Sequence, residues 1–137
     1  MRRALAAILG TAAFALPVAD AVATTPKKTV VTKTITGPSA QAGRWGDVQV
    51  TLVVRKTTTT VNSHKTVKRR IVGVGTPVYP DHTGRSIFIN QQALPILEQE
   101  VLQAQFNPNI EMVSGATYTS NGFAESLQAA LLKAKRV

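Results

Sequence analysis

The segment DVQVTLVVR, residues 47–55, alternates between apolar and polar side chains over most of its length. Successive side chains of a strand point to opposite faces, so the even-numbered residues share one face: Val48, Val50, Leu52 and Val54. The opposite face carries Gln49, Thr51, Val53 and Arg55. This pattern is typical of a strand in a sheet that is covered on one side only. The rest of the chain must supply the cover.

Two later segments have apolar residues at helical spacing and can cover the sheet. The first helix is expected to begin at Pro95, because proline is tolerated in the first turn of a helix. It is expected to end at residues 107–109. The second is expected over residues 121–135. Residues 29–36, 57–61 and 70–76 are further strand candidates, rich in β-branched residues. We therefore predict an α+β fold, a small single domain in which two helices pack on a twisted antiparallel sheet.

The length and the residue inventory limit the classes of protein. A chain of 137 residues fits one domain. It contains no cysteine, which excludes disulfides, a lipoprotein anchor, covalent haem and a cysteine-held iron–sulfur cluster. The two histidines, His64 and His82, lie in polar, loop-like stretches without companions at ligand spacing, so we expect no metal site. Electron transfer by such a chain would require an organic cofactor.

The N-terminus has the three parts of an export signal. A basic start, Met1-Arg2-Arg3, precedes an apolar run from Ala4 to Val18 and small residues that suit a cleavage site. A membrane anchor is the weaker interpretation, because the run is short and is broken by Pro17 and Asp20. We expect a signal peptide over residues 1–23, a polar linker and first strand over 24–36, and the main domain over 37–137. The mature protein is expected outside the cytoplasm or in the cell envelope, where membrane association is one option.

The chain is strongly basic, with a formal net charge of +9. Such a balance suits anionic neighbours: phospholipid headgroups, cell-wall phosphate polymers or an acidic redox partner. The densest cluster lies between Lys65 and Arg70. Charges that protect a strand edge from aggregation explain this cluster better than nucleic-acid contact, because no aromatic residues accompany them for base stacking. We expect no nucleic-acid partner.

A hydroxyl-rich turn precedes the second predicted helix and is the candidate site. It comprises Ser114, Gly115, Ala116, Thr117, Tyr118, Thr119 and Ser120. The first N–H groups of a helix lack partners and carry partial positive charge, which favours bound phosphate. Gly115 and Ala116 leave the backbone open to close approach. The residues alone favour an ordinary N-cap, since Ser and Thr are preferred at that position without any ligand.

A resemblance to a known family reverses that preference. Residues 111–123, EMVSGATYTSNGF, closely resemble the signature of the FMN-binding domain family, which includes subunits of the sodium-translocating NADH:quinone oxidoreductase and of the Rnf complex. The resemblance implies FMN as the cofactor, joined by a phosphoester to Thr117, with Thr119 the less favoured acceptor. It also implies a partner, a flavin transferase that takes FMN from FAD. Where the family usually has Asp, this chain has Glu111.

The resemblance continues upstream, more weakly. Residues 43–50, GRWGDVQV, resemble the opening glycine and strand of the family, and residues 90–105 resemble its first helix. The FMN-binding domain is accordingly expected over residues 37–137. Trp45 is the candidate platform for the flavin ring, and Tyr118, beside the expected acceptor, is the second candidate.

The leading hypothesis is an exported FMN-binding electron carrier. The flavin would perform the redox chemistry, and the carboxylates form no recognisable acid–base pair, so no catalytic residue is assigned. The sequence does not identify the electron donor or acceptor, and a membrane-bound partner is one option. Two alternatives stay open: a flavin-dependent reductase of a small exported substrate, and a basic module that binds cell-wall or membrane anions without flavin.

Overall fold

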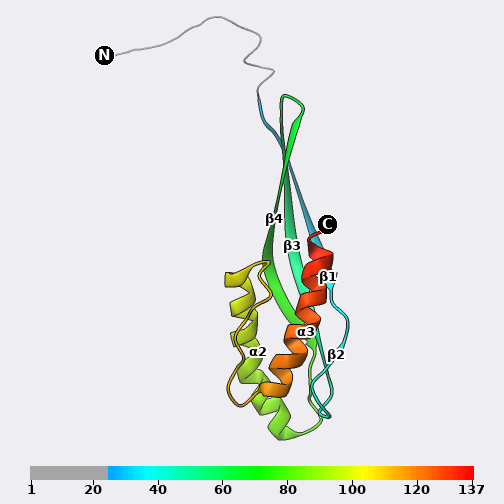
Figure 1. The fold of residues 1–137 in the computed structure, drawn as a ribbon, viewed down its shortest axis with the longest axis vertical. Helices are drawn as coiled ribbons and strands as arrows, with labels where there is room; N and C mark the ends of the chain where they lie inside the picture. Colours follow the sequence, from blue (N-terminus) through cyan, green and yellow to red (C-terminus); the bar gives the residue numbers. More distant parts are fainter. Residues whose placement is uncertain (1–24) are drawn as a thin grey trace, which may run out of the picture. The chain divides into compact units, whose positions relative to one another are not determined.

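The computed structural model describes residues 25–137, and the predicted signal peptide lies outside the described residues. Four strands are followed by two helices: β1 (Lys27–Thr36), β2 (Ala40–Gln41), β3 (Asp47–Val61), β4 (His64–Val78), α2 (Gly84–Ala104) and α3 (Thr117–Ala134) (Figure 1). Two compact units share these elements. One includes Thr57–Val67, and the other, Val30–Lys56 with Lys68–Val137, holds both helices. None of the described helices is long and apolar enough to cross a membrane.

The strands form one antiparallel sheet with β3 at its centre. The order is β1-β3-β2, and β4 also pairs with β3. The short strand β2 is antiparallel to β3, with Ala40 opposite Val48 and Gln41 opposite Asp47. The predicted α+β class, an antiparallel sheet with two helices in one small domain, is confirmed. The predicted domain boundaries stay predictions.

A two-residue turn joins β3 and β4. Asn62 and Ser63 have φ angles of 52° and 69°, so both residues are left-handed, as in the turn that matches the natural twist of a hairpin. Residues 57–61 are strand, as predicted, and residues 55–57 join them to residues 47–54 in one continuous strand, β3. His64 begins β4, although its polar surroundings suggested a loop.

The predicted face of β3 forms the core. Its four even-numbered aliphatic side chains are fully buried, whereas Gln49, Thr51 and Val53 stay half-buried. The residues that bury this face come from both helices: Leu94, Leu97 and Val101 of α2, and Phe123, Leu127, Ala130 and Leu131 of α3. Both helices therefore pack on the same face of the sheet.

Both helices begin earlier than the sequence indicated. Helix α2 begins at Gly84, and Thr83 caps it by accepting a hydrogen bond from the Ser86 N–H at 3.0 Å. Pro95 is thus inside the helix. It lies on the exposed side, where water can reach the carbonyl of Gln91 that its missing N–H leaves without a partner. Helix α3 begins at Thr117 and not near residue 121.

A glutamine side chain covers the outer edge of β4. Gln105 ends α2 with a φ of 58°, and its amide forms two hydrogen bonds with the backbone of one residue, Ile71. Its Oε1 accepts from the Ile71 N–H at 2.8 Å, and its Nε2 donates to the Ile71 carbonyl at 3.1 Å. The Gln105 side chain therefore satisfies the backbone N–H and C=O groups of Ile71, which would otherwise be unpaired at this edge of the sheet.

A buried serine attaches α3 to the sheet. Ser126 Oγ accepts a hydrogen bond from the Val50 N–H at 3.0 Å, while the Val50 carbonyl accepts from the Gly37 N–H at 2.8 Å. A Cβ at Gly37 would lie 2.6 Å from the Ser126 carbonyl oxygen, so only glycine permits this close approach of the helix.

Replacing Ser126 with alanine should therefore destabilise the protein. The change leaves the buried Val50 N–H without a partner, which we expect to lower the free energy of unfolding by about 1–3 kcal/mol. Urea unfolding measures the loss. Ser39→Ala, at an exposed position, is the control and should leave the unfolding midpoint unchanged. Equal stability of the two variants would contradict this role of Ser126.

Candidate functional site

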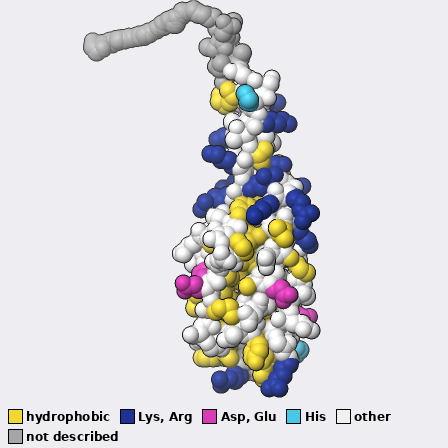
Figure 2. Space-filling model, viewed as in Figure 1, with side chains coloured by type: hydrophobic (Ala, Val, Ile, Leu, Met, Phe, Trp, Pro, Cys, Tyr) yellow, Lys and Arg dark blue, Asp and Glu magenta, His cyan; other side chains and the backbone are white. Residues whose placement is uncertain are grey.

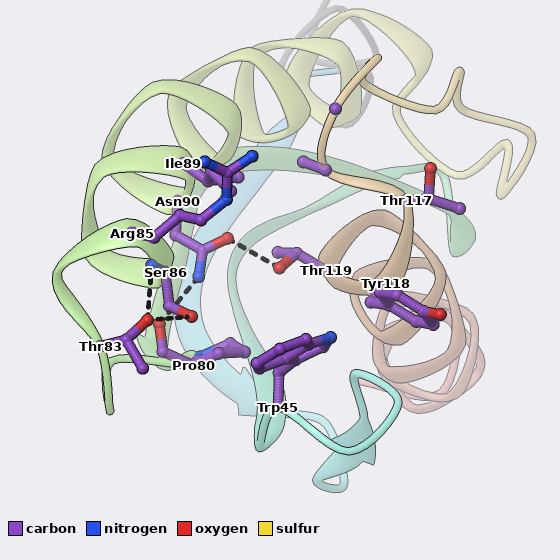
Figure 3. Close-up of a pocket in the computed structure, with 12 residues that line it drawn as sticks. Trp45, Pro80, Thr83, Arg85, Ser86, Ile89, Asn90, Thr117, Tyr118 and Thr119 are labelled. Atoms are coloured by element: carbon purple, nitrogen blue, oxygen red, sulfur yellow. Dashed lines mark hydrogen bonds between the residues drawn. The ribbon is translucent and has the colours of Figure 1, made fainter.

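A pocket of about 230 Å³ lies where the first turns of α2 and α3 meet (Figure 3). One wall comes from the start of α2 and the loop before it: Pro80, Thr83, Arg85, Ser86, Ile89 and Asn90. The other comes from the start of α3 and the β2–β3 loop: Gly115, Ala116, Thr117, Tyr118, Thr119 and Trp45. Two helix N-termini, each carrying partial positive charge, thus border the same cavity.

The start of α3 leaves its backbone donors available. Ala116 is the N-cap residue, and it has no side-chain oxygen with which to accept from the first N–H groups. The first backbone bond that α3 makes back to its cap runs from the Ser120 N–H to the Ala116 carbonyl at 2.9 Å. Gly115 has a φ of 83° and open space around its Cα. The ordinary side-chain cap that the sequence favoured is therefore not what this turn contains.

The pocket brings together six of the eight predicted cofactor-binding residues, all except Ser114 and Ser120. Ser114 lies exposed in the preceding turn. Ser120 is buried, and its Oγ accepts from the Val113 N–H at 3.1 Å, which fixes the loop before α3. Neither serine lines the cavity, and Ser120 holds the loop that precedes α3. That the other six bind a cofactor stays a prediction.

The two threonines of the turn have different surroundings. Thr117 is exposed at the edge of the pocket, whereas Thr119 is buried, with 6% of its surface accessible. The Thr119 hydroxyl donates to Asn90 Oδ1 at 2.7 Å (Figure 3). A modifying enzyme could reach the hydroxyl of Thr117 without disturbing the fold, and it could not do so for Thr119.

Asn90 joins the two walls of the pocket. It is buried in α2, accepts from Thr119 at the start of α3, and donates through Nδ2 to the Pro80 carbonyl at 2.8 Å. It therefore connects three segments that are distant in the sequence. From the sequence, Asn90 is expected only near the start of a helix, and no pattern indicates a role for it in the site.

Arg85 is the one cationic residue that lines the pocket, and the sequence analysis missed it. It lies in the first turn of α2, and in Figure 3 its guanidinium extends from that helix toward the loop that precedes α3. The same lining contains no carboxylate and no imidazole. The cap sequence Thr83-Gly84-Arg85-Ser86 was the signal that could have located this wall.

Two aromatic residues stand at the mouth of the pocket. Trp45 and Tyr118 are 40% and 58% exposed, which is unusual for large rings. The Arg44 guanidinium lies over the Trp45 ring, 4.9 Å from its centroid. The Tyr118 ring lies against Gly43, where an added Cβ would be 2.6 Å from its Cδ1 atom. Each ring is therefore in contact with a residue of the β2–β3 loop and is also exposed to solvent.

The comparisons with known proteins identify a family. Residues 43–132 match the model of the FMN-binding domain. The matched segment contains every residue that lines the pocket. No curated protein and no solved structure matches the chain. Within residues 25–137, no three acidic, histidine or cysteine side chains gather as metal ligands would.

The bridging role of Asn90 can be tested by removing its side chain. Asn90→Ala leaves two buried partners, the Pro80 carbonyl and the Thr119 hydroxyl, unsatisfied, and we expect a loss of about 1–3 kcal/mol for each in urea unfolding. Gln92→Ala, an exposed position on the same helix, serves as the control. If both variants unfold at the wild-type midpoint, Asn90 does not hold the two walls together.

Proposed function

Because the chain belongs to the FMN-binding domain family, we propose that it is an exported electron carrier that holds FMN between the first turns of α2 and α3. FMN is the cofactor that the family match gives. The observation that carries the proposal is the overlap of the matched segment with the pocket: both walls and both exposed aromatics fall within it. The predicted signal peptide supports export.

The residues of the pocket suit the phosphate end of FMN. The uncapped N-terminus of α3 offers backbone donors, and Gly115 leaves room for an anion to approach them. Arg85 on the opposite wall can pair with phosphate oxygens, since a guanidinium donates two parallel hydrogen bonds to such groups. We therefore place the phosphate between α3 and Arg85.

The size of the pocket suits only part of the cofactor. Drug-sized ligands occupy cavities of roughly 300–1,000 Å³, and this pocket measures about 230 Å³. The flavin ring would then extend to the mouth, where Trp45 and Tyr118 offer exposed aromatic faces. A ring held there stays accessible to the surface of another protein, as electron exchange requires.

Thr117 is our proposed attachment point. Its hydroxyl is exposed, whereas that of Thr119 is buried and bonded to Asn90. Attachment would form an ester bond between Thr117 Oγ1 and the phosphorus of FMN, with FAD as the donor and AMP as the leaving group. A flavin transferase would catalyse this step. A single covalent bond at the edge of the pocket would hold the cofactor where non-covalent contacts are few.

The chain itself would bind and orient the cofactor. When bound, FMN supplies the electron-transfer chemistry. The lining contains no carboxylate or imidazole to give or take a proton, which favours a carrier over a reductase with its own substrate. The family match, with both exposed aromatic residues inside the matched segment, favours the carrier over a basic module that binds anions without flavin.

Thr117→Ala should abolish covalent flavin. We expect the wild-type chain, coexpressed with a flavin transferase, to carry one FMN increment in its intact mass, located on the peptide that contains residues 114–120. Thr117→Ser should keep the increment, because serine retains the hydroxyl. A mass increment that persists in Thr117→Ala and maps to Thr119 would contradict the proposal, because it would show that FMN is attached to Thr119.

Arg85→Gln should weaken non-covalent FMN binding. In the Thr117→Ala background, we expect the dissociation constant to rise roughly ten- to a hundred-fold, since a hydrogen bond to a charged group is worth about 1.5–3 kcal/mol. Fluorescence titration with FMN measures it. Arg55→Gln removes the same charge from an exposed position on β3 and should bind as its parent does. Equal weakening in both variants would show that net charge, and not Arg85, matters.

A further inference from the structure

The inward faces of three strands change from aliphatic to cationic side chains near the end of α3. Along β3, Val54 is followed on the same face by Lys56, and on β4 Ile71 is preceded on the same face by Arg69. On β1, Lys33 lies two residues from Ile35, which packs on the core. On the inward faces of all three strands, the aliphatic side chains of the core are therefore followed by cationic side chains.

Three hydrogen bonds connect β4 and β1 to the C-terminal end of the chain. Arg69 donates from Nε and Nη2 to the carbonyl of Val137, at 3.0 and 2.7 Å. Lys133 Nζ donates to the carbonyl of Thr36 at 3.2 Å. We call the resulting cluster the basic face: Lys33, Lys56, Arg69, Lys133, Lys135 and Arg136. Figure 2 shows Lys and Arg gathered around this end of α3.

Cations of β3 lie opposite cations of β4, an arrangement that lowers the stability of the sheet. The two-residue turn sets Val61 opposite His64, and counting back along both strands sets Lys56 opposite Arg69 and Arg55 opposite Arg70. Like charges that face each other across a sheet are destabilising. Charges protect an edge when they lie on the edge strand, whereas Arg55 and Lys56 lie on the central strand β3, so edge protection does not explain them.

Exposed aliphatic side chains adjoin the basic face. Val31 precedes Lys33 on the same side of β1 and is 41% exposed, and Leu132 precedes Lys133 and is 53% exposed. Cations mixed with exposed aliphatics are typical of surfaces that lie at a membrane interface, where headgroups attract the charges and the apolar groups enter the boundary region. A soluble polymer of phosphates would make no use of the aliphatics.

We propose that the basic face docks the protein on an anionic phospholipid membrane. The acidic residues of the described chain all lie elsewhere: Asp47, Asp81, Glu98, Glu100, Glu111 and Glu125. Electrostatic attraction to headgroups, reinforced by Val31 and Leu132, is the source of binding. This inference concerns residues outside the pocket and does not depend on the proposed flavin site.

The test compares two variants that carry the same net charge. Arg69, Lys133 and Arg136 bond to backbone carbonyls, so the basic-face variant replaces the other three: Lys33→Gln, Lys56→Gln and Lys135→Gln. The control adds three carboxylates on the exposed side of α2: Gln91→Glu, Gln92→Glu and Gln99→Glu. Each variant lowers the formal charge of the chain by three.

Partitioning of the full chain onto vesicles is measured by sedimentation. Vesicles containing phosphatidylglycerol are compared with pure phosphatidylcholine. Residues 1–23, which include Arg2 and Arg3, are the same in all three proteins, so their contribution cancels when the variants are compared with wild type. We expect wild type to prefer the anionic vesicles, the basic-face variant to lose about a hundred-fold of this preference, and the control to keep most of it. The thermal midpoint of the basic-face variant should be unchanged or higher, because one like-charged pair is removed.

Three results would overturn the proposal. The first is equal binding of wild type to anionic and neutral vesicles. The second is an equal loss in both variants, which would make net charge and not the basic face responsible. The third is binding to soluble polyphosphate without binding to anionic vesicles, which would identify a polymer as the partner.

Discussion

Burial of one face of β3 is the constraint on which the rest of the structure depends. The fully buried side chains of β3 all lie on one face, which α2 and α3 share, and the first turns of the two helices meet at the same pocket. The partial positive charges of two helix N-termini therefore add at one place. Asn90 fixes their separation by bonding to Thr119, and Ser126 fixes α3 on the strand beneath it. The proposed cofactor site thus follows from the way the core is covered.

The sequence predicted what depends on local pattern. The alternation in β3, the two helices of the α+β fold and the turn at residues 114–115 could be predicted because each depends on residues that are close in the sequence. Residues 117–120, predicted as part of that turn, are the first turn of α3. The first wall of the pocket was not predicted, since the start of α2 was placed at Pro95 and the capping residue Thr83 was overlooked. Arg85 and Asn90 were missed for that reason. Their roles depend on contacts with α3, which spacing along the chain does not reveal.

Charge is distributed along α3 in the order that the helix dipole favours. Its N-terminus lacks a side-chain cap and opens on the pocket, where an anion is proposed, and its C-terminal end is surrounded by lysine and arginine. The sequence analysis interpreted the cluster near Arg70 as protection of a strand edge. The pairing of β3 with β4 sets like charges opposite each other, which supports the membrane role proposed for the basic face.

Titration of the Thr117→Ala chain with FMN, followed by backbone amide shifts in NMR spectra, tests the central claim most directly, because it locates the cofactor without covalent attachment. The account predicts saturable shifts confined to residues 80–90, 115–119 and the loop that carries Trp45, the segments that contain the lining of the pocket. Saturable shifts centred on the basic face, with the pocket unaffected, would contradict it. So would the absence of any saturable change.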